Sequence, residues 1–237
     1  MSRPAGRLAR ITAKVSARTR AAGDLRYLFI MTYGRSGSTL MQGVLNSIPG
    51  YLIRGENRDA VYHLYRFHQT CVHEAQRVTR ADGRVLRGTH PFFGIDEFPA
   101  DRSLEELRDT VTRTLLRPGP DTRVTGFKEI RWYQKDLPDY VAFLRQAFPG
   151  ARFLVNTRDH EAVLASKFWR SKPRDGRLER AEQGILDVAA ELGDAAYRVH
   201  YDDYVADPDV LSGMFRWLEE PYDAARVRDV MSVRHSF

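Results

Sequence analysis

The segment from Arg26 to Asn46 constrains the fold more than any other part of this chain of 237 residues. An apolar run from Tyr27 to Met31 is followed by the loop Tyr33-Gly-Arg-Ser-Gly-Ser-Thr39 and then by a helical pattern. Glycines allow backbone angles and close approaches that a side chain would block, and hydroxyls add donors to the free N–H groups that open a helix. This order of buried strand, tight loop and helix predicts an anion site, to which Arg35 adds a full charge.

The loop differs from that of nucleotide triphosphatases, which need Gly-x-x-x-x-Gly-Lys-Ser/Thr, because it has no lysine in that place. Its sequence Gly-Arg-Ser-Gly-Ser-Thr-Leu resembles the 5′-phosphosulfate loop of the sulfotransferases. That family holds 3′-phosphoadenosine 5′-phosphosulfate (PAPS) without a metal, on a P-loop nucleotide-kinase-like α/β fold whose central parallel sheet is flanked by helices. The resemblance implies that five residues cradle the 5′-phosphosulfate, namely Arg35, Ser36, Gly37, Ser38 and Thr39.

A second motif, in the C-terminal half, fits the first. Residues 153–155 form an apolar run suited to a buried parallel strand, Arg158 follows at its carboxyl end, and Asp159 is the expected cap of the next helix. Ligands of open α/β sheets gather at that edge. In the sulfotransferase pattern an arginine here and a serine eight residues later clamp the 3′-phosphate, which implies this role for Arg158 and Ser166. Considered alone, the Arg-Asp pair would fit a cap and a surface ion pair.

The rest of the chain alternates strand and helix, as in an α/β domain. We expect strands at residues 26–32, 51–54, 122–127, 152–157 and 197–201, and helices at residues 38–47, 57–79, 103–117, 135–147, 159–170 and 178–192, followed by two short helices. Residues 80–101 are rich in glycine and proline and predict a long loop, a candidate lid over an acceptor. We expect residues 24–237 to form one sulfotransferase domain, since 43% hydrophobic residues suffice for its core.

The formal net charge of +6 comes from the first 23 residues, which contain six basic side chains and no acidic one. The remainder of the chain is formally neutral, which argues against nucleic acid as a partner. We expect residues 1–23 to be a basic tail or helix. It would be either a loosely docked terminal helix or a peripheral contact with an anionic membrane surface.

Cysteine content and hydropathy limit the compartment and the cofactors. The single cysteine, Cys71, cannot form an internal disulfide and has no neighbours at metal-ligand spacing, so we expect no metal site. No apolar run approaches the roughly 18 residues of a membrane span. With arginine far outnumbering lysine, we expect a bacterial, cytoplasmic protein that acts at most at the inner face of the membrane, without the membrane anchor of Golgi sulfotransferases.

Sulfuryl transfer is an in-line displacement at sulfur, which needs a base and positive groups around the bridging oxygen. Glu56 follows the first helix after a short apolar run, where carbohydrate sulfotransferases and the bacterial trehalose type carry a glutamate that faces the sulfuryl group. The resemblance implies that Glu56 is the base, and burial would favour its proton uptake. The alternative is a first-turn glutamate that complements its helix dipole. Histidines compete for the role, because cytosolic aryl and steroid sulfotransferases use one, and the candidates are His63, His68 and, above these, His90.

The segment Thr125-Gly-Phe-Lys-Glu-Ile-Arg-Trp132 also resembles a recurring sulfotransferase sequence. The resemblance implies that Lys128 is a catalytic cation near the transferring group, and that Glu129 or Arg131 orients it or the acceptor. Together with His90, these two complete the candidate acceptor-binding residues. On the residues alone, the segment fits a strand-end salt-bridge cluster equally well.

The favoured function is transfer of a sulfuryl group from PAPS to a hydroxyl of a carbohydrate, glycolipid or glycosylated metabolite, which leaves 3′,5′-bisphosphoadenosine (PAP). The chain lacks the Arg-Lys-Gly donor loop of the cytosolic aryl and steroid enzymes, and this favours a carbohydrate-type relative. Two rival hypotheses remain open at this point. One is a P-loop small-molecule kinase with a degenerate loop, and the other is a non-catalytic binder of nucleic acid or membrane surfaces through the basic tail.

Overall fold

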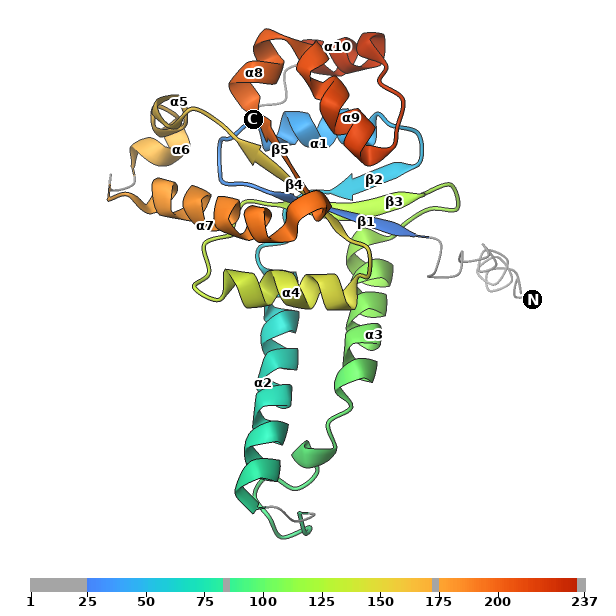
Figure 1. The fold of residues 1–237 in the computed structure, drawn as a ribbon, viewed down its shortest axis with the longest axis vertical. Helices are drawn as coiled ribbons and strands as arrows, with labels where there is room; N and C mark the ends of the chain where they lie inside the picture. Colours follow the sequence, from blue (N-terminus) through green and yellow to red (C-terminus); the bar gives the residue numbers. More distant parts are fainter. Residues whose placement is uncertain (1–24, 83–85, 172–174, 234–237) are drawn as a thin grey trace, which may run out of the picture.

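Five parallel strands form a central sheet in the computed structural model, which describes residues 25–82, 86–171 and 175–233. Their spatial order is β2-β3-β1-β4-β5, and each adjacent pair is parallel. The strands are β1 (Arg26–Met31), β2 (Tyr51–Arg54), β3 (Val124–Glu129), β4 (Arg152–Thr157) and β5 (Ala196–His200). Helices flank the sheet (Figure 1), so the expected α/β fold with a central parallel sheet is confirmed.

Each face of the sheet is covered by a separate set of helices (Figure 1). One face carries α1 (Ser38–Asn46), α8 (Tyr201–Ala206), α9 (Ser212–Leu218) and α10 (Ala224–Ser232). The other carries α4 (Leu137–Ala147) and α7 (Arg177–Leu192). The strands read as continuous apolar runs because both faces are buried.

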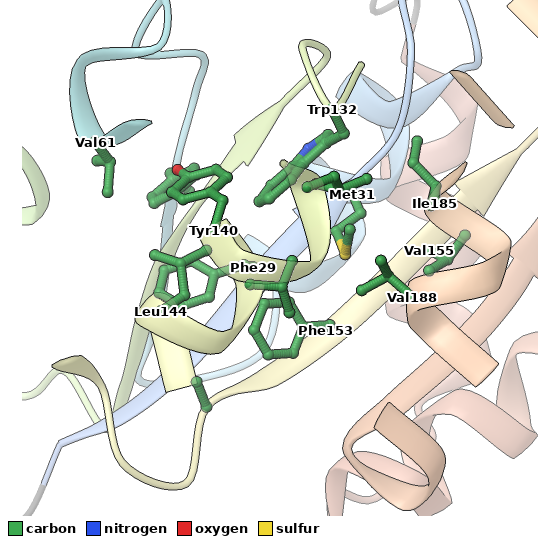
Figure 2. Packing of buried hydrophobic residues seen from close by; sticks show 14 of the residues in the cluster. Phe29, Met31, Val61, Trp132, Tyr140, Leu144, Phe153, Val155, Ile185 and Val188 are labelled. Carbon is green, nitrogen blue, oxygen red and sulfur yellow. The ribbon is translucent and has the colours of Figure 1, made fainter. Parts of the chain in front are cut away.

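Alternate residues of β1 belong to the two hydrophobic cores on opposite faces of the sheet. Leu28 and Ile30 pack with the helices around α1. Phe29 packs on the other side, where it contacts Phe127 and Phe153 of the neighbouring strands. Figure 2 shows this second core, in which aromatic and aliphatic side chains of the sheet meet those of α4 and α7. The sheet is therefore held from both sides, which fixes the loops at its carboxyl edge.

Two strands approach each other closely at Gly126 of β3. A Cβ atom added there would lie 1.7 Å from the carbonyl oxygen of Leu28 on β1. No side chain fits in this space, so the pairing of β1 with β3 requires glycine at this position.

A long pair of helices, α2 (Ala60–Asp82) and α3 (Ala100–Thr110), projects from the sheet (Figure 1). The chain between them includes the short 3₁₀ helix η2 (Ile95–Glu97) and packs at the end of α2 farthest from the sheet. Part of the expected long loop, residues 83–85, lies outside the described residues, as does the predicted basic tail 1–23. No helix in the described ranges is long and apolar enough to cross a membrane.

Three expectations about helices were wrong. The helix expected at 159–170 is two short helices, α5 (His160–Leu164) and α6 (Lys167–Arg170), because Ser166 between them is extended, with φ −70° and ψ 151°. The helix expected at 103–117 begins at Ala100 and ends in a π-helical segment, η3 (Val111–Leu116). The C-terminal section has α8, α9 and α10 in place of two helices, with the 3₁₀ turns η4 (Gly193–Ala195) before β5 and η5 (Pro208–Leu211) after α8.

Candidate functional site

A cavity of about 740 Å³ lies at the carboxyl edge of the sheet. Residues that follow each of the five strands line it, including Arg35 after β1, Glu56 after β2, Ile130 after β3, Arg158 after β4 and Tyr201 after β5. Because parallel strands end at one edge, residues far apart in sequence converge there. The cavity wall includes most of the site residues that the sequence predicts.

The loop after β1 shapes one wall of this cavity. Gly37 has φ +82°, and a Cβ atom there would lie 1.9 Å from a ring carbon of Tyr201, so only glycine fits. Arg35 also has positive φ, 73°, and its exposed side chain lines the cavity without an ion-pair partner among the described residues. Ser38 and Thr39 open α1, whose first turn has no side-chain cap. A helix N-terminus with free N–H groups beside an arginine forms an anion site.

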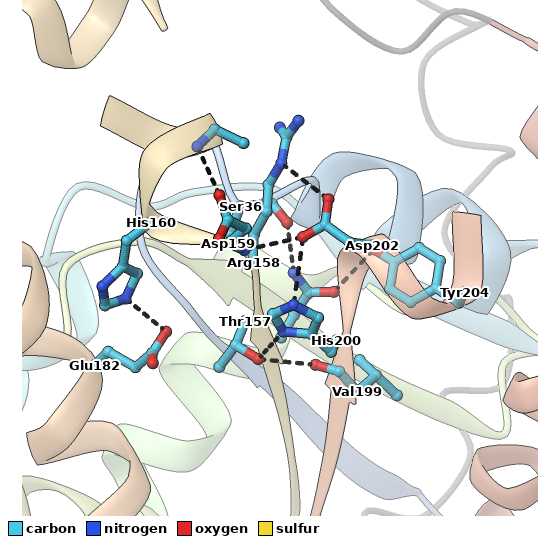
Figure 3. A network of polar contacts seen from close by, with 12 residues as sticks. Ser36, Thr157, Arg158, Asp159, His160, Glu182, Val199, His200, Asp202 and Tyr204 are labelled. Carbon is cyan, nitrogen blue, oxygen red and sulfur yellow. Dashed lines mark hydrogen bonds and ion pairs between the residues drawn. The ribbon is translucent and has the colours of Figure 1, made fainter. Parts of the chain in front are cut away.

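Ser36 supports the loop and does not line the cavity. Its side chain is buried, and its hydroxyl is 2.6 Å from that of Thr32, which in turn donates to the carbonyl oxygen of Asn156 on β4. The amide of Asn156 donates back to the Ser36 carbonyl oxygen, and Tyr204 donates to the same amide (Figure 3). Sequence reasoning missed Thr32, Asn156 and Tyr204. A polar asparagine within the apolar run of β4 was the available signal.

Arg158 joins the second motif to the first. Its guanidinium donates to the carbonyl oxygen of Arg35 at 3.1 Å and lies 4.3 Å from the centre of the Tyr201 ring. Its Nε atom is 3.8 Å from Asp202 but has no hydrogen-bond partner among the described residues. The Ser166 hydroxyl is likewise buried without a described partner. These unpaired donors fit an anion that arrives from outside the chain.

Asp202, beside Arg158, is itself held in place. His200 lies 3.3 Å from its carboxylate and contacts the hydroxyl of Thr157, while the backbone N–H of Asp159 donates to it at 2.9 Å (Figure 3). The side chain of Asp159 accepts from the backbone of α5, so the expected cap is confirmed. Residues at the ends of β4 and β5 therefore hold Asp202 in place beside Arg158.

Lys128 and Glu56 form an ion pair in the cavity, with 2.6 Å between Nζ and Oε1. The lysine side chain is 6% exposed, whereas that of Glu56 is 37% exposed, so the burial that would favour proton uptake by Glu56 is only partial. Glu56 precedes the first residue of α2, Ala60, by four positions. The alternative of a first-turn glutamate is therefore wrong.

Glu129 and Arg131 lie beside the site and not in its wall. Glu129 is 3% exposed, and its carboxylate accepts from the backbone N–H groups of Asn57 at 3.1 Å and Asp59 at 3.5 Å. Arg131 pairs with the Asp59 carboxylate at 3.3 Å. Both residues hold the turn that follows Glu56, and this resembles the strand-end cluster that the sequence left open.

None of the three candidate histidines lines the cavity. His63 and His68 belong to α2, and His68 bonds to Ser103 of α3 at 3.1 Å. His90 accepts from the backbone of Phe92 at 3.1 Å, within the segment that packs at the far end of α2. Its role in acceptor binding stays a prediction.

No cluster of three or more His, Cys, Asp or Glu side chains that could hold a metal occurs in the described ranges.

The fold and this cavity can be compared with known proteins. A family model with the description "Sulfotransferase family" matches residues 28–224 of the sequence. The sulfotransferase domain of the olefin synthase from Synechococcus PCC 7002 is a similar solved structure, at 17% identity and TM-score 0.47, covering 89% of this chain and 78% of that one. Sulfotransferase STF9 from Mycobacterium avium is similar at 16% identity and TM-score 0.45, covering 88% and 68%. An unliganded sugar kinase from Janibacter sp. HTCC2649 gives 18% identity and TM-score 0.38, covering 82% and 95%. A search of curated proteins found no match.

Proposed function

Because the chain belongs to the sulfotransferase family, we propose that it transfers a sulfuryl group from PAPS to a hydroxyl of a carbohydrate, glycolipid or glycosylated metabolite. The observation that carries the choice of donor is that Arg35, the start of α1 and Arg158 line one cavity. The uncapped start of α1 with Arg35 is one proposed site, and Arg158 is the centre of the other. Ser166 does not line the cavity, but its hydroxyl is buried without a described partner, and we assign it to the second site. A nucleotide with phosphate groups at both the 5′ and the 3′ position matches two such sites.

The residues of each site have distinct tasks in this proposal. Arg35, Ser38 and Thr39 hold the 5′-phosphosulfate together with the backbone at Gly37. The Arg158 fork and the Ser166 hydroxyl hold the 3′-phosphate, with Tyr201 packed against the guanidinium. Ser36 acts through the loop that it supports.

Lys128 and Glu56 are the proposed catalytic pair, with Arg35. Glu56 takes the proton of the acceptor hydroxyl while the acceptor oxygen bonds to sulfur and the bond from sulfur to the bridging phosphate oxygen breaks. Lys128 and Arg35 stabilise the charge that grows on the bridging oxygen. The contact of 2.6 Å between Glu56 and Lys128 supports a shared location at the reacting centre.

The acceptor class is proposed from the kind of base and from the missing Arg-Lys-Gly loop. We further propose that the reaction needs no metal, that nucleic acid is not a partner, and that residues 1–23 contact a membrane surface peripherally. Those residues lie outside the described ranges.

Calorimetric titration tests the donor. We expect PAP to bind in the micromolar range in the presence of a chelator, and 5′-AMP to bind more weakly because it lacks the group that Arg158 and Ser166 would read. Equal affinity for the two nucleotides, or tight binding of ATP only with magnesium, would contradict the proposal. A screen of sugars and glycolipids with labelled PAPS then identifies the acceptor.

A further inference from the structure

The hydroxyl of Tyr33 connects the two halves of the proposed donor site. It accepts a hydrogen bond from the backbone N–H of Arg158 at 2.9 Å and lies 3.0 Å from the carbonyl oxygen of the same residue. Tyr33 is the first residue of the loop that follows β1, and it is 3% exposed. One buried oxygen thus connects the start of the 5′ loop to the backbone that carries the arginine of the 3′ site.

Residues of α5 and α7 hold this hydroxyl in turn. The carboxylate of Glu182, on α7, accepts a hydrogen bond from Tyr33. His160 Nε2 is 3.2 Å from that carboxylate, without the alignment of a hydrogen bond, and its ring packs edge-on against the tyrosine ring (Figure 3 shows the histidine and the glutamate). Burial and the bond to Glu182 both raise the pKa of Tyr33, so the phenol keeps its proton at neutral pH.

We propose that Tyr33 is a positioning residue that fixes Arg158 relative to the 5′ loop, and thereby sets how strongly the protein prefers nucleotides with a 3′-phosphate. The inference rests on the proposed function. Tyr33 does not line the cavity and touches no phosphate in this arrangement. Its effect is on the backbone of Arg158, whose guanidinium must bond to the Arg35 carbonyl and still present a free edge to the ligand.

The test measures the dissociation constants of PAP and of 5′-AMP for the full chain and its Tyr33→Phe variant. We expect the preference for PAP to fall about fivefold to tenfold, the loss typical of one hydrogen bond, while 5′-AMP binding changes less than about twofold. In the background of Arg158→Ala, Tyr33→Phe should change the preference no further, because the two residues act as one unit. Equal weakening of both nucleotides, or additive effects of the two substitutions, would overturn the inference.

Tyr27→Phe is the matched control. Like Tyr33→Phe, it removes one hydroxyl from a buried tyrosine. The Tyr27 hydroxyl lies 3.1 Å from that of Thr112 and does not line the cavity, so the substitution should leave the preference unchanged. A change as large as that of Tyr33→Phe would also overturn the inference. If Tyr33→Phe does not fold, Glu182→Gln decides the question. It weakens the hydrogen bond that the Tyr33 hydroxyl donates to residue 182, and it should also lower the preference for PAP.

The wild-type measurement separates this inference from the proposed function. A wild-type protein without preference for PAP would overturn both. A wild-type preference that survives in Tyr33→Phe would leave the proposed donor standing and remove only the positioning role.

Discussion

The ion pair of Lys128 with Glu56 joins a buried cation to a carboxylate that the solvent reaches. A lysine that is almost fully buried needs its partner, because an unpaired charge in such a place is costly. Glu56 therefore has two tasks at the residue scale. It neutralises Lys128 at rest and, in the proposed reaction, receives a proton from the acceptor.

Glu56→Gln keeps the shape of the side chain and removes the base. Sulfuryl transfer to the acceptor should fall by about 10² to 10⁴, the range for a positioned general base, while PAP binding survives. Labelled-donor assays measure the sulfuryl transfer, and calorimetry measures the binding of PAP. Glu105→Gln, at an exposed position of α3, is the control and should retain activity. If Glu56→Gln stays active while His90→Asn abolishes transfer with PAP binding intact, the base is the histidine.

Arg158→Ala should weaken PAP by about 1.5–3 kcal/mol more than it weakens 5′-AMP, because it removes a charge-assisted pair to one phosphate only. Arg158→Lys keeps the charge and loses the fork, and should recover only part of the loss. Calorimetric titration of the three proteins provides the comparison. Equal loss for both nucleotides would assign Arg158 to support of the fold.

At the scale of elements, the contact between β1 and β3 leaves no space for a side chain at Gly126. The Gly126→Ala variant places a methyl group against the Leu28 backbone and should lower the free energy of unfolding by about 3 kcal/mol or more. In α7, Gly184→Ala meets only an ordinary contact, 3.9 Å from Leu137, and should be neutral or stabilising by up to about 1 kcal/mol. Denaturant unfolding measures both, and similar stabilities would contradict the close approach.

The contact of α2 with α3 should be sensitive to acid. Burial lowers the pKa of His68, whereas a histidine of the unfolded chain takes up its proton near pH 6.5. Below that pH the unfolded state binds more protons, so the free energy of unfolding should decrease as the pH falls. His68→Gln should remove part of this loss between about pH 7.5 and about pH 5.5. The exposed His63→Gln is the control, and an equal effect of the two variants would argue against the effect of partial burial on His68.

Sequence patterns predicted those elements whose causes are local. The apolar runs of β1 and β4 and the glycine loop before α1 follow from neighbouring residues, and the strands lie within two positions of expectation. The inward bonding of Ser36 could not be predicted, because its partner Asn156 is 120 positions away. The exposure of Glu56 could not be predicted either, because it depends on how the neighbouring strands β2 and β3 end. The roles inferred for individual site residues remain predictions, since they depend on a ligand and on such distant contacts.

At the scale of the whole molecule, a ligand that bridges the loops after β1 and β4 should stabilise the entire fold. PAP at about 100 times its dissociation constant adds about 2.7 kcal/mol, which for a chain of this size corresponds to a rise in melting temperature of about 5–10 °C. Thermal unfolding in the presence of a chelator checks this, with adenosine as the control ligand. A shift that appears only when magnesium is added would contradict a metal-free donor site.

Because β1 and β4 are adjacent in the sheet, their pairing sets the distance between the loops that follow them. Their register pairs Phe29 with Phe153 and Met31 with Val155, so backbone hydrogen bonds fix the spacing at which the two loops leave the sheet. Substitutions on the surrounding helices can change how the cavity is lined without changing that spacing. In the proposed function, substitutions on these helices would change which acceptor fits, while the span between the two loops stays constant.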